Sequence, residues 1–197
     1  MSSTAWIILA VLACVAAWVV VTYNALVQKR NRIANAFGQI DVQLKRRYDL
    51  IPNLVEVARR YLAHEAQTLQ AVASARGAAV DAAAAARARP ADAAAVQGLA
   101  AAERVLGGSM GRLMAVVESY PELKADATMQ SLAEELTSTE NRIGFARQAY
   151  NDEVLAFNDA ATQFPGNAVA GWFGMRPAAM LESTQGPQER QAPRVAF

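Results

Sequence analysis

A row of apolar residues at helical spacing constrains this sequence more than any other feature. Six of them lie between positions 33 and 51 at steps of three or four residues, namely Ile33, Phe37, Ile40, Leu44, Tyr48 and Ile51. Such steps place side chains on one face of an α-helix, whereas a half-buried strand alternates with a period of two. We therefore predict a long helix with one buried side, and we expect the rest of the chain to complete its core.

Pro52 follows this row directly and limits how the helix continues. Proline lacks an amide proton, and its ring collides with the carbonyl group four residues earlier. Asp49 carries a short carboxylate of the kind that caps a new helix. We predict a turn between two antiparallel helices at this point. One continuous helix with a kink at Pro52 is the alternative.

The second helix is expected to run from Pro52 to Arg89, because Pro90 would stop it. Its apolar stripe consists of Leu54, Val55, Ala58, Tyr61, Leu62, Leu69 and Val72. The alanine-rich run 77–89 has a high helix propensity but offers little apolar area. We expect this end of the helix to project beyond the main core.

A third helix should begin near Asp92, a suitable cap, and end near Tyr120. Its predicted core residues are Val96, Leu99, Val105, Leu106, Leu113, Val116 and Val117. Gly107, Gly108 and Gly111 interrupt this helix and would permit a bend or the close approach of another helix.

The fourth helix, from about Asp126 to Thr162, has the clearest period of the chain. Its stripe consists of Met129, Leu132, Leu136, Ile143, Ala146, Tyr150, Val154 and Phe157. Glu140 falls on the same stripe, and a buried carboxylate costs several kcal/mol unless it is paired. We predict that Arg47 or Arg76 meets Glu140 in the core.

The segment Ala5–Val21 contains seventeen residues without a charge. Together with the residues up to position 27 it would form a helix of roughly 34 Å, which is enough to cross a bilayer core of about 30 Å. No basic residue precedes the run, so we expect a retained anchor rather than a cleaved signal peptide. Trp6 near one end, and Trp18 and Tyr23 near the other, suit the membrane interface.

Three basic residues, Lys29, Arg30 and Arg32, follow the span closely. Basic residues beside a span tend to stay on the cytoplasmic side, so we predict a cytoplasmic body and an N-terminus outside. We also expect these three side chains to contact lipid headgroups.

The predicted fold class is all-α, with an N-terminal transmembrane helix followed by an elongated antiparallel four-helix bundle. Residues 1–27 would form the anchor and 28–165 the bundle. A short aromatic segment, 166–181, would follow, and the polar tail 182–197 is expected to be disordered.

The residues needed for common reaction chemistry are missing from the sequence. His64 is the only histidine, so catalytic triads and multi-histidine metal sites are not available. The glycine run near 107 lacks the Lys-Ser or Lys-Thr pair of a phosphate-binding loop. We therefore expect no catalytic residue, no cofactor and no metal, and the protein is predicted not to be an enzyme. A net charge of only +1 gives no reason to expect a nucleic-acid partner.

Several motifs together resemble the LemA family of bacterial membrane proteins. They include Tyr23-Asn24-x-Leu26-Val27, Arg30-Asn31-Arg32, Asn35-Ala36-Phe37, Gln39 to Arg47, Asp49 to Val55, Tyr120 to Ala125, Glu140 to Ile143, Tyr150-Asn151 and Phe164-Pro165. The similarity covers about Ala5 to Met175 and implies a membrane anchor with a bundle of four long helices. It implies no catalytic residue, cofactor or substrate.

These observations lead to two hypotheses about function. The first is a non-enzymatic, single-pass protein of the bacterial inner membrane that acts as a helical scaffold or self-assembling unit, with membrane organisation as a theme by analogy. Its expected partners are the lipid bilayer and further copies of the chain. The second is an adaptor that presents its bundle to a membrane protein partner, such as a protease or an envelope-stress protein.

Overall fold

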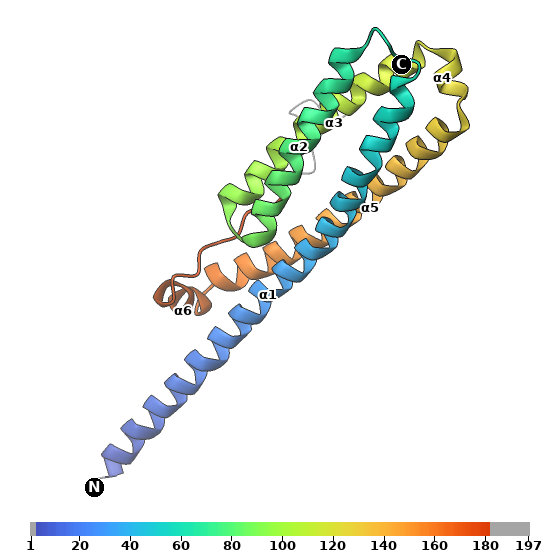
Figure 1. The fold of residues 1–197 in the computed structure, drawn as a ribbon. Helices are drawn as coiled ribbons and strands as arrows, with labels where there is room; N and C mark the ends of the chain where they lie inside the picture. The colour runs from blue at the N-terminus through green and yellow to red at the C-terminus, as the bar shows by residue number, and fades with distance from the viewer. Residues whose placement is uncertain (1–2, 182–197) are drawn as a thin grey trace, which may run out of the picture.

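Six helices make up the body of the computed structural model, which describes residues 3–181 (Figure 1). They are α1 (Ser3–Arg59), α2 (Ala66–Ala88), α3 (Ala93–Glu118), α4 (Pro121–Ala125), α5 (Ala127–Thr162) and α6 (Gly166–Trp172). No strand occurs within residues 3–181, so the predicted all-α class is confirmed. The tail predicted for 182–197 lies outside the described residues.

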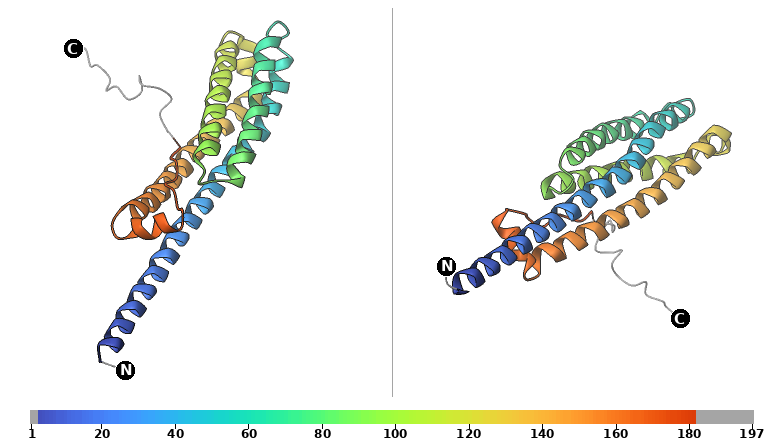
Figure 2. Two further views of the ribbon diagram at one scale, coloured as in Figure 1. Left: turned by 90° about the vertical axis from the view of Figure 1, so that its left-hand side faces the viewer. Right: turned by 90° about the horizontal axis from the view of Figure 1, so that it is seen from below.

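The four long helices lie roughly along one direction, and the N-terminal part of α1 projects alone beyond the others (Figures 1 and 2). α5 runs antiparallel to α1, and α2 and α3 form a hairpin. The closest backbone packing is between α1 and α5, between α2 and α3, and between α1 and α2. α3 does not approach α5 in the same way, so one edge of the bundle is open.

α1 passes through Pro52 without interruption, and the turn predicted there is wrong. The carbonyl of Tyr48, four residues earlier, would normally accept a hydrogen bond from the amide of residue 52. Instead it accepts a hydrogen bond of 2.6 Å from Nε of Arg76 on α2. A side chain from the neighbouring helix therefore replaces the missing amide. The chain turns later, at residues 60–65, and α2 is correspondingly shorter than predicted.

The helical row that defined the sequence forms the core. All six of its residues are buried in α1, and most predicted positions of the other helices are buried too. Val105 is an exception because it is 60% exposed, and Tyr61, Val116, Leu132 and Ala146 are only partly buried. The row therefore identified the core face of α1 correctly, while the predicted core stripes of α3 and α5 include positions that are not fully buried.

The alanine-rich end of α2 does not project beyond the core as predicted. Ala75, Ala79, Ala83 and Ala86 are buried, and their small side chains let α2 lie close to its neighbours. The guanidinium of Arg87 pairs with Asp41 of α1 at 2.7 Å and holds this end of α2 in place. Small residues at steps of three or four thus contribute close packing rather than a solvated helix end.

Two aspartates cap helices where the sequence predicts helix starts. The carboxylate of Asp92 accepts a hydrogen bond from the amide of Ala95, and that of Asp126 accepts one from Met129, both at 2.9 Å. The bond from Met129 and a second from the hydroxyl of Tyr61 hold the pKa of Asp126 below its usual value. Tyr61 thereby ties the turn after α1 to the start of α5.

The bond between Arg76 and the Tyr48 carbonyl can be tested with Pro52. Arg76→Met should lower the free energy of unfolding by about 1.5–3 kcal/mol, because a buried carbonyl loses a charged donor. In a Pro52→Ala background the restored amide can bond to the same carbonyl, so the loss should shrink by more than about 0.5 kcal/mol. Urea unfolding of the four proteins, followed by circular dichroism, measures this coupling. Strictly additive effects would contradict the replacement.

Candidate functional site

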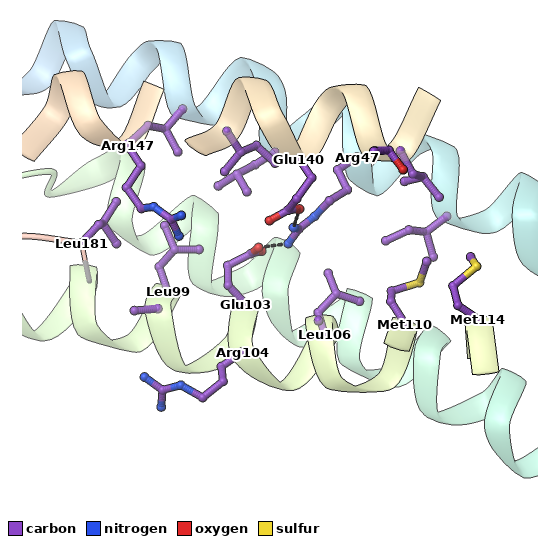
Figure 3. Close-up of a pocket in the computed structure, with 18 of the residues that line it drawn as sticks. Arg47, Leu99, Glu103, Arg104, Leu106, Met110, Met114, Glu140, Arg147 and Leu181 are labelled. Atoms are coloured by element: carbon purple, nitrogen blue, oxygen red, sulfur yellow. Dashed lines mark hydrogen bonds and ion pairs between the residues drawn. The ribbon is translucent and has the colours of Figure 1, made fainter. Parts of the chain in front are cut away.

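A cleft of about 400 Å³ lies where α3 faces α1 and α5 (Figure 3). This α3/α5 cleft is lined by Ile40, Leu44, Arg47 and Ile51 of α1, by Leu99, Glu103, Leu106, Gly107, Met110 and Met114 among others of α3, and by Leu136, Glu140, Ile143 and Arg147 among others of α5. Its volume is within the range of ligand-binding pockets, about 300–1,000 Å³. The walls are mainly aliphatic, and flexible methionines line one end.

Arg47 is the main polar group of the cleft, and its side chain is only 10% exposed. Its guanidinium lies between the carboxylates of Glu103 on α3 and Glu140 on α5 and forms an ion pair with each (Figure 3). The hydroxyl of Tyr48 also donates a hydrogen bond to Glu103. The Nε atom of Arg47 has no hydrogen-bond partner within residues 3–181. One buried cation thus joins α1, α3 and α5 across the open edge.

The two arginines considered for Glu140 have different roles. The structure brings Arg47 to Glu140, whereas Arg76 bonds to the backbone of Tyr48 instead. The expectation of a buried Glu140 is wrong, because its side chain is 55% exposed at the rim of the cleft. Arg47 is the buried member of the pair.

Glu103 was not identified from the sequence, although a signal for it is present. It lies four residues after Leu99 and three before Leu106, on the core stripe of α3. Its side chain is 18% exposed, so it is the more buried of the two carboxylates. The reasoning that selected Glu140 applies to Glu103 equally well.

Residues 175–181, here called the C-terminal strap, run from α6 back along α5 towards the cleft (Figure 1). The side-chain amide of Asn158 accepts from the amide and donates to the carbonyl of Ala178, at 2.8 and 2.9 Å. Asn151 does the same with Leu181 at 2.8 Å in both directions. These bonds place Leu181 against the cleft, which it lines.

Tyr150 connects the strap to the α2–α3 turn. Its ring is fully buried and packs edge-on against Phe37, with ring centroids 6.0 Å apart. Its hydroxyl lies within hydrogen-bond distance of the carbonyl oxygens of Pro90, at 2.9 Å, and Ala179, at 3.0 Å. Burial raises the pKa of Tyr150 to about 12.

The predicted membrane-facing residues lie along the projecting part of α1. Trp6 and Trp18 are 59% and 39% exposed, and Tyr23 is half-buried against Phe173, with ring centroids 4.5 Å apart. This helix is long and apolar enough to cross a membrane by length and composition. Within the described residues, the large apolar side chains from Trp6 to Val15 are exposed, as expected for a lipid-facing surface.

The juxtamembrane basic residues lie just beyond this apolar part. Arg30 and Arg32 are exposed and Lys29 is half-buried. None of the three forms an ion pair with another residue of the described chain. Their charges are therefore available to an external partner.

The cleft offers aliphatic surface together with the ion-paired Arg47 and two further lining arginines, Arg104 and Arg147. Arg47 is held by two carboxylates, and the hydroxyl of Tyr48 is turned to one of them. In residues 3–181, no group of three His, Cys, Asp or Glu side chains is placed to hold a metal ion. The arrangement suits the binding of an apolar surface.

Comparison with known proteins identifies the family. A model described as the LemA family matches residues 36–197. The chain belongs to the LemA family.

Among curated proteins, this LemA-family chain is similar to Magnetosome protein MamQ 2 and Magnetosome protein MamQ 1 of Paramagnetospirillum magneticum strain AMB-1. Each is 27% identical over 191 residues, covering 88% of this chain and 70% of the relative. Magnetosome protein MamQ of Magnetospirillum gryphiswaldense strain MSR-1 is 26% identical over 163 residues, covering 75% and 60%. With the apolar helix, these similarities indicate a membrane-associated helical protein.

Loss of the buried Arg47 should destabilise the fold more than neutralisation of the exposed Glu140. Arg47→Met removes the ion pair of the partly buried Glu103 and leaves it only the hydroxyl of Tyr48, so we expect a loss of about 3 kcal/mol in the free energy of unfolding. Glu140→Gln should cost less than about 1 kcal/mol, because that carboxylate is largely solvated. Urea unfolding measures both values, and equal losses would contradict the assignment of Arg47 as the buried member.

The buried tyrosines should make the protein sensitive to alkali. Burial raises the pKa of Tyr48 and Tyr150 to about 12, from 10.0 for an unperturbed tyrosine. The folded chain holds these protons more tightly, so their contribution is complete below pH 10 and is lost as the pH rises towards 12. Thermal melts across this range should show the loss, and the double variant Tyr48→Phe, Tyr150→Phe should reduce it. An unchanged slope in that variant would contradict the prediction.

Proposed function

We propose that this protein is a non-enzymatic, single-pass scaffold of the bacterial inner membrane that self-associates through the α3/α5 cleft. The observation that carries the proposal is the continuity of α1, whose 57 residues would extend about 85 Å. One helix leads from the apolar segment to the far end of the body, so the anchor would fix the direction in which the body stands. A stiff connection of this kind suits a structural protein.

The placement of the body on the cytoplasmic side is part of the proposal. Lys29, Arg30 and Arg32 follow the apolar segment, and basic residues in this position favour retention on the cytoplasmic side. Their unpaired charges would also bind anionic headgroups. The similarity to magnetosome proteins supports a role in organising the membrane in which α1 would be anchored.

The glycines of α3 support self-association. Gly107 and Gly111 are four residues apart, on the side of α3 that borders the cleft, where Gly107 is a lining residue. A Cβ atom at either position would meet nothing within 4 Å. Each glycine costs about 1 kcal/mol in a helix relative to alanine, and no residue among 3–181 fills the space beside it. A helix of a second copy could approach closely there and cover the aliphatic walls.

Gly107 and Gly111 therefore provide the test of assembly. Size-exclusion chromatography with light scattering in detergent should show oligomers of the wild-type protein, and the double variant Gly107→Leu, Gly111→Leu should shift them towards monomer. The matched control is Gly98→Leu, since Gly98 lies on the same helix, also faces open space and does not line the cleft. The control should assemble like the wild type.

Two results would contradict parts of this proposal. An equal effect of Gly98→Leu would remove the assigned face. A wild-type protein that is monomeric at all concentrations would remove self-association and favour the alternative of an adaptor for a membrane protein partner. The position of Leu181 supports that alternative, because the chain continues from the edge of the cleft into residues 182–197.

A further inference from the structure

Three aromatic side chains at α6 are exposed although the helix itself is firmly packed. Phe164, Trp172 and Phe173 are 86%, 76% and 53% exposed. Val169 and Ala170, on the other side of α6, are buried against α1 and α5. Exposed aromatic residues grouped within ten positions are unusual on a water-facing surface and indicate a binding surface.

The location of α6 along α1 points to the identity of the partner. α6 packs beside the lower part of α1 (Figure 1), where Val19 and Tyr23 of α1 contact the core cluster and the ring of Phe173 lies 4.5 Å from that of Tyr23. A bilayer core of about 30 Å takes roughly 20 helical residues. A span that begins at Ala5 therefore ends near Asn24. This places the contact between Tyr23 and Phe173 at the boundary between hydrocarbon and headgroups.

The charge of the segment suits the same location. From Gln163 to Leu181 the sequence has no acidic residue, and its only charged side chain is Arg176. The exposed Arg30 and Arg32 of α1 follow within three turns of Tyr23. Aromatic rings beside basic groups are typical of protein surfaces that sit in an anionic headgroup layer.

Contacts within the chain hold α6 and the residues on either side of it in place, with no lipid or protein partner needed. A Cβ atom on Gly166 would lie 2.3 Å from the carbonyl oxygen of Ala160, so glycine is needed for the tight turn from α5 into α6. After α6, the amide of Met175 donates to the carbonyl of Ala170 at 2.9 Å, and Asn158 binds Ala178. The exposed rings are therefore presented by a preformed structure.

We propose that α6 forms a second membrane contact, in which Phe164, Trp172 and Phe173 insert into the headgroup region beside the span. This contact would give the body a second point of attachment beside the span and so limit the tilt of the span and body together relative to the membrane. The inference rests on the anchoring by α1 in the proposed function. It adds a surface contact from a part of the chain more than 130 residues away in sequence.

Tryptophan fluorescence tests this contact in the full-length protein. In vesicles of phosphatidylcholine and phosphatidylglycerol with brominated acyl chains, a variant that keeps only Trp172 (Trp6→Phe, Trp18→Phe) should be quenched. A variant that keeps only Trp18 reports on anchoring. The negative control carries Phe145→Trp with the three native tryptophans changed to Phe. Phe145 is 74% exposed and lies about 25 Å before the end of α5.

The expected result is quenching of Trp18 and Trp172 and no quenching at position 145. The emission of Trp172 should also be blue-shifted relative to that of the tryptophan at position 145. If Trp18 is quenched while Trp172 behaves like position 145, the α6 contact is overturned and anchoring stands. If Trp18 is not quenched either, anchoring and the α6 contact both fail. Quenching at all three positions would show general burial in lipid and would also overturn a specific contact.

Discussion

The continuity of α1 through Pro52 is the constraint on which the rest of the structure depends. A helix that ended at Ile51 would separate the membrane segment from the far half of the body. The helix continues because Arg76 supplies the donor that Pro52 lacks and because Ile51 and Leu54, on either side, are fully buried. Both effects come from packing against other helices, so the rest of the body keeps α1 helical at Pro52. The orientation of the anchor is then transmitted along the whole length of α1.

Much of this fold could be predicted because its cores and caps are local patterns. The apolar stripes of α1 and α5 follow from the spacing of neighbouring residues. The aspartates at positions 92 and 126 cap helices that begin at the next residue. The turn predicted at Pro52 failed because its compensation comes from residue 76, on another helix. The alanines of α2 were misjudged for a related reason, since the value of a small side chain depends on how closely a neighbour approaches.

The candidate site was less predictable than the fold. Arg47 and Glu140 could be proposed as partners from the stripe alone, but the stripe did not reveal which of them is buried. Which residue is buried depends on the cleft between α3 and α5. Glu140 lies at its rim and is exposed, whereas Arg47 lies inside it. Glu103 lies at a comparable position on α3, and only the folded bundle shows that it completes the cluster. A buried cation with two carboxylates holds the helices at a set spacing where aliphatic packing is incomplete.

The cleft and the α6 segment are connected by the C-terminal strap. The strap leaves α6 beside the end of the apolar segment, is held by Asn158 and Asn151, and ends with Leu181 against the cleft. The hydroxyl of Tyr150 lies within hydrogen-bond distance of a carbonyl oxygen in the strap and of one in the α2–α3 turn, so it can donate its one proton to either, and the hairpin that forms one wall of the cleft lies beside the same strap. A displacement of α6 would therefore have to move the strap or break these bonds. The α6 segment and the cleft are thus parts of one mechanically continuous body, with α1 on one side and the strap on the other.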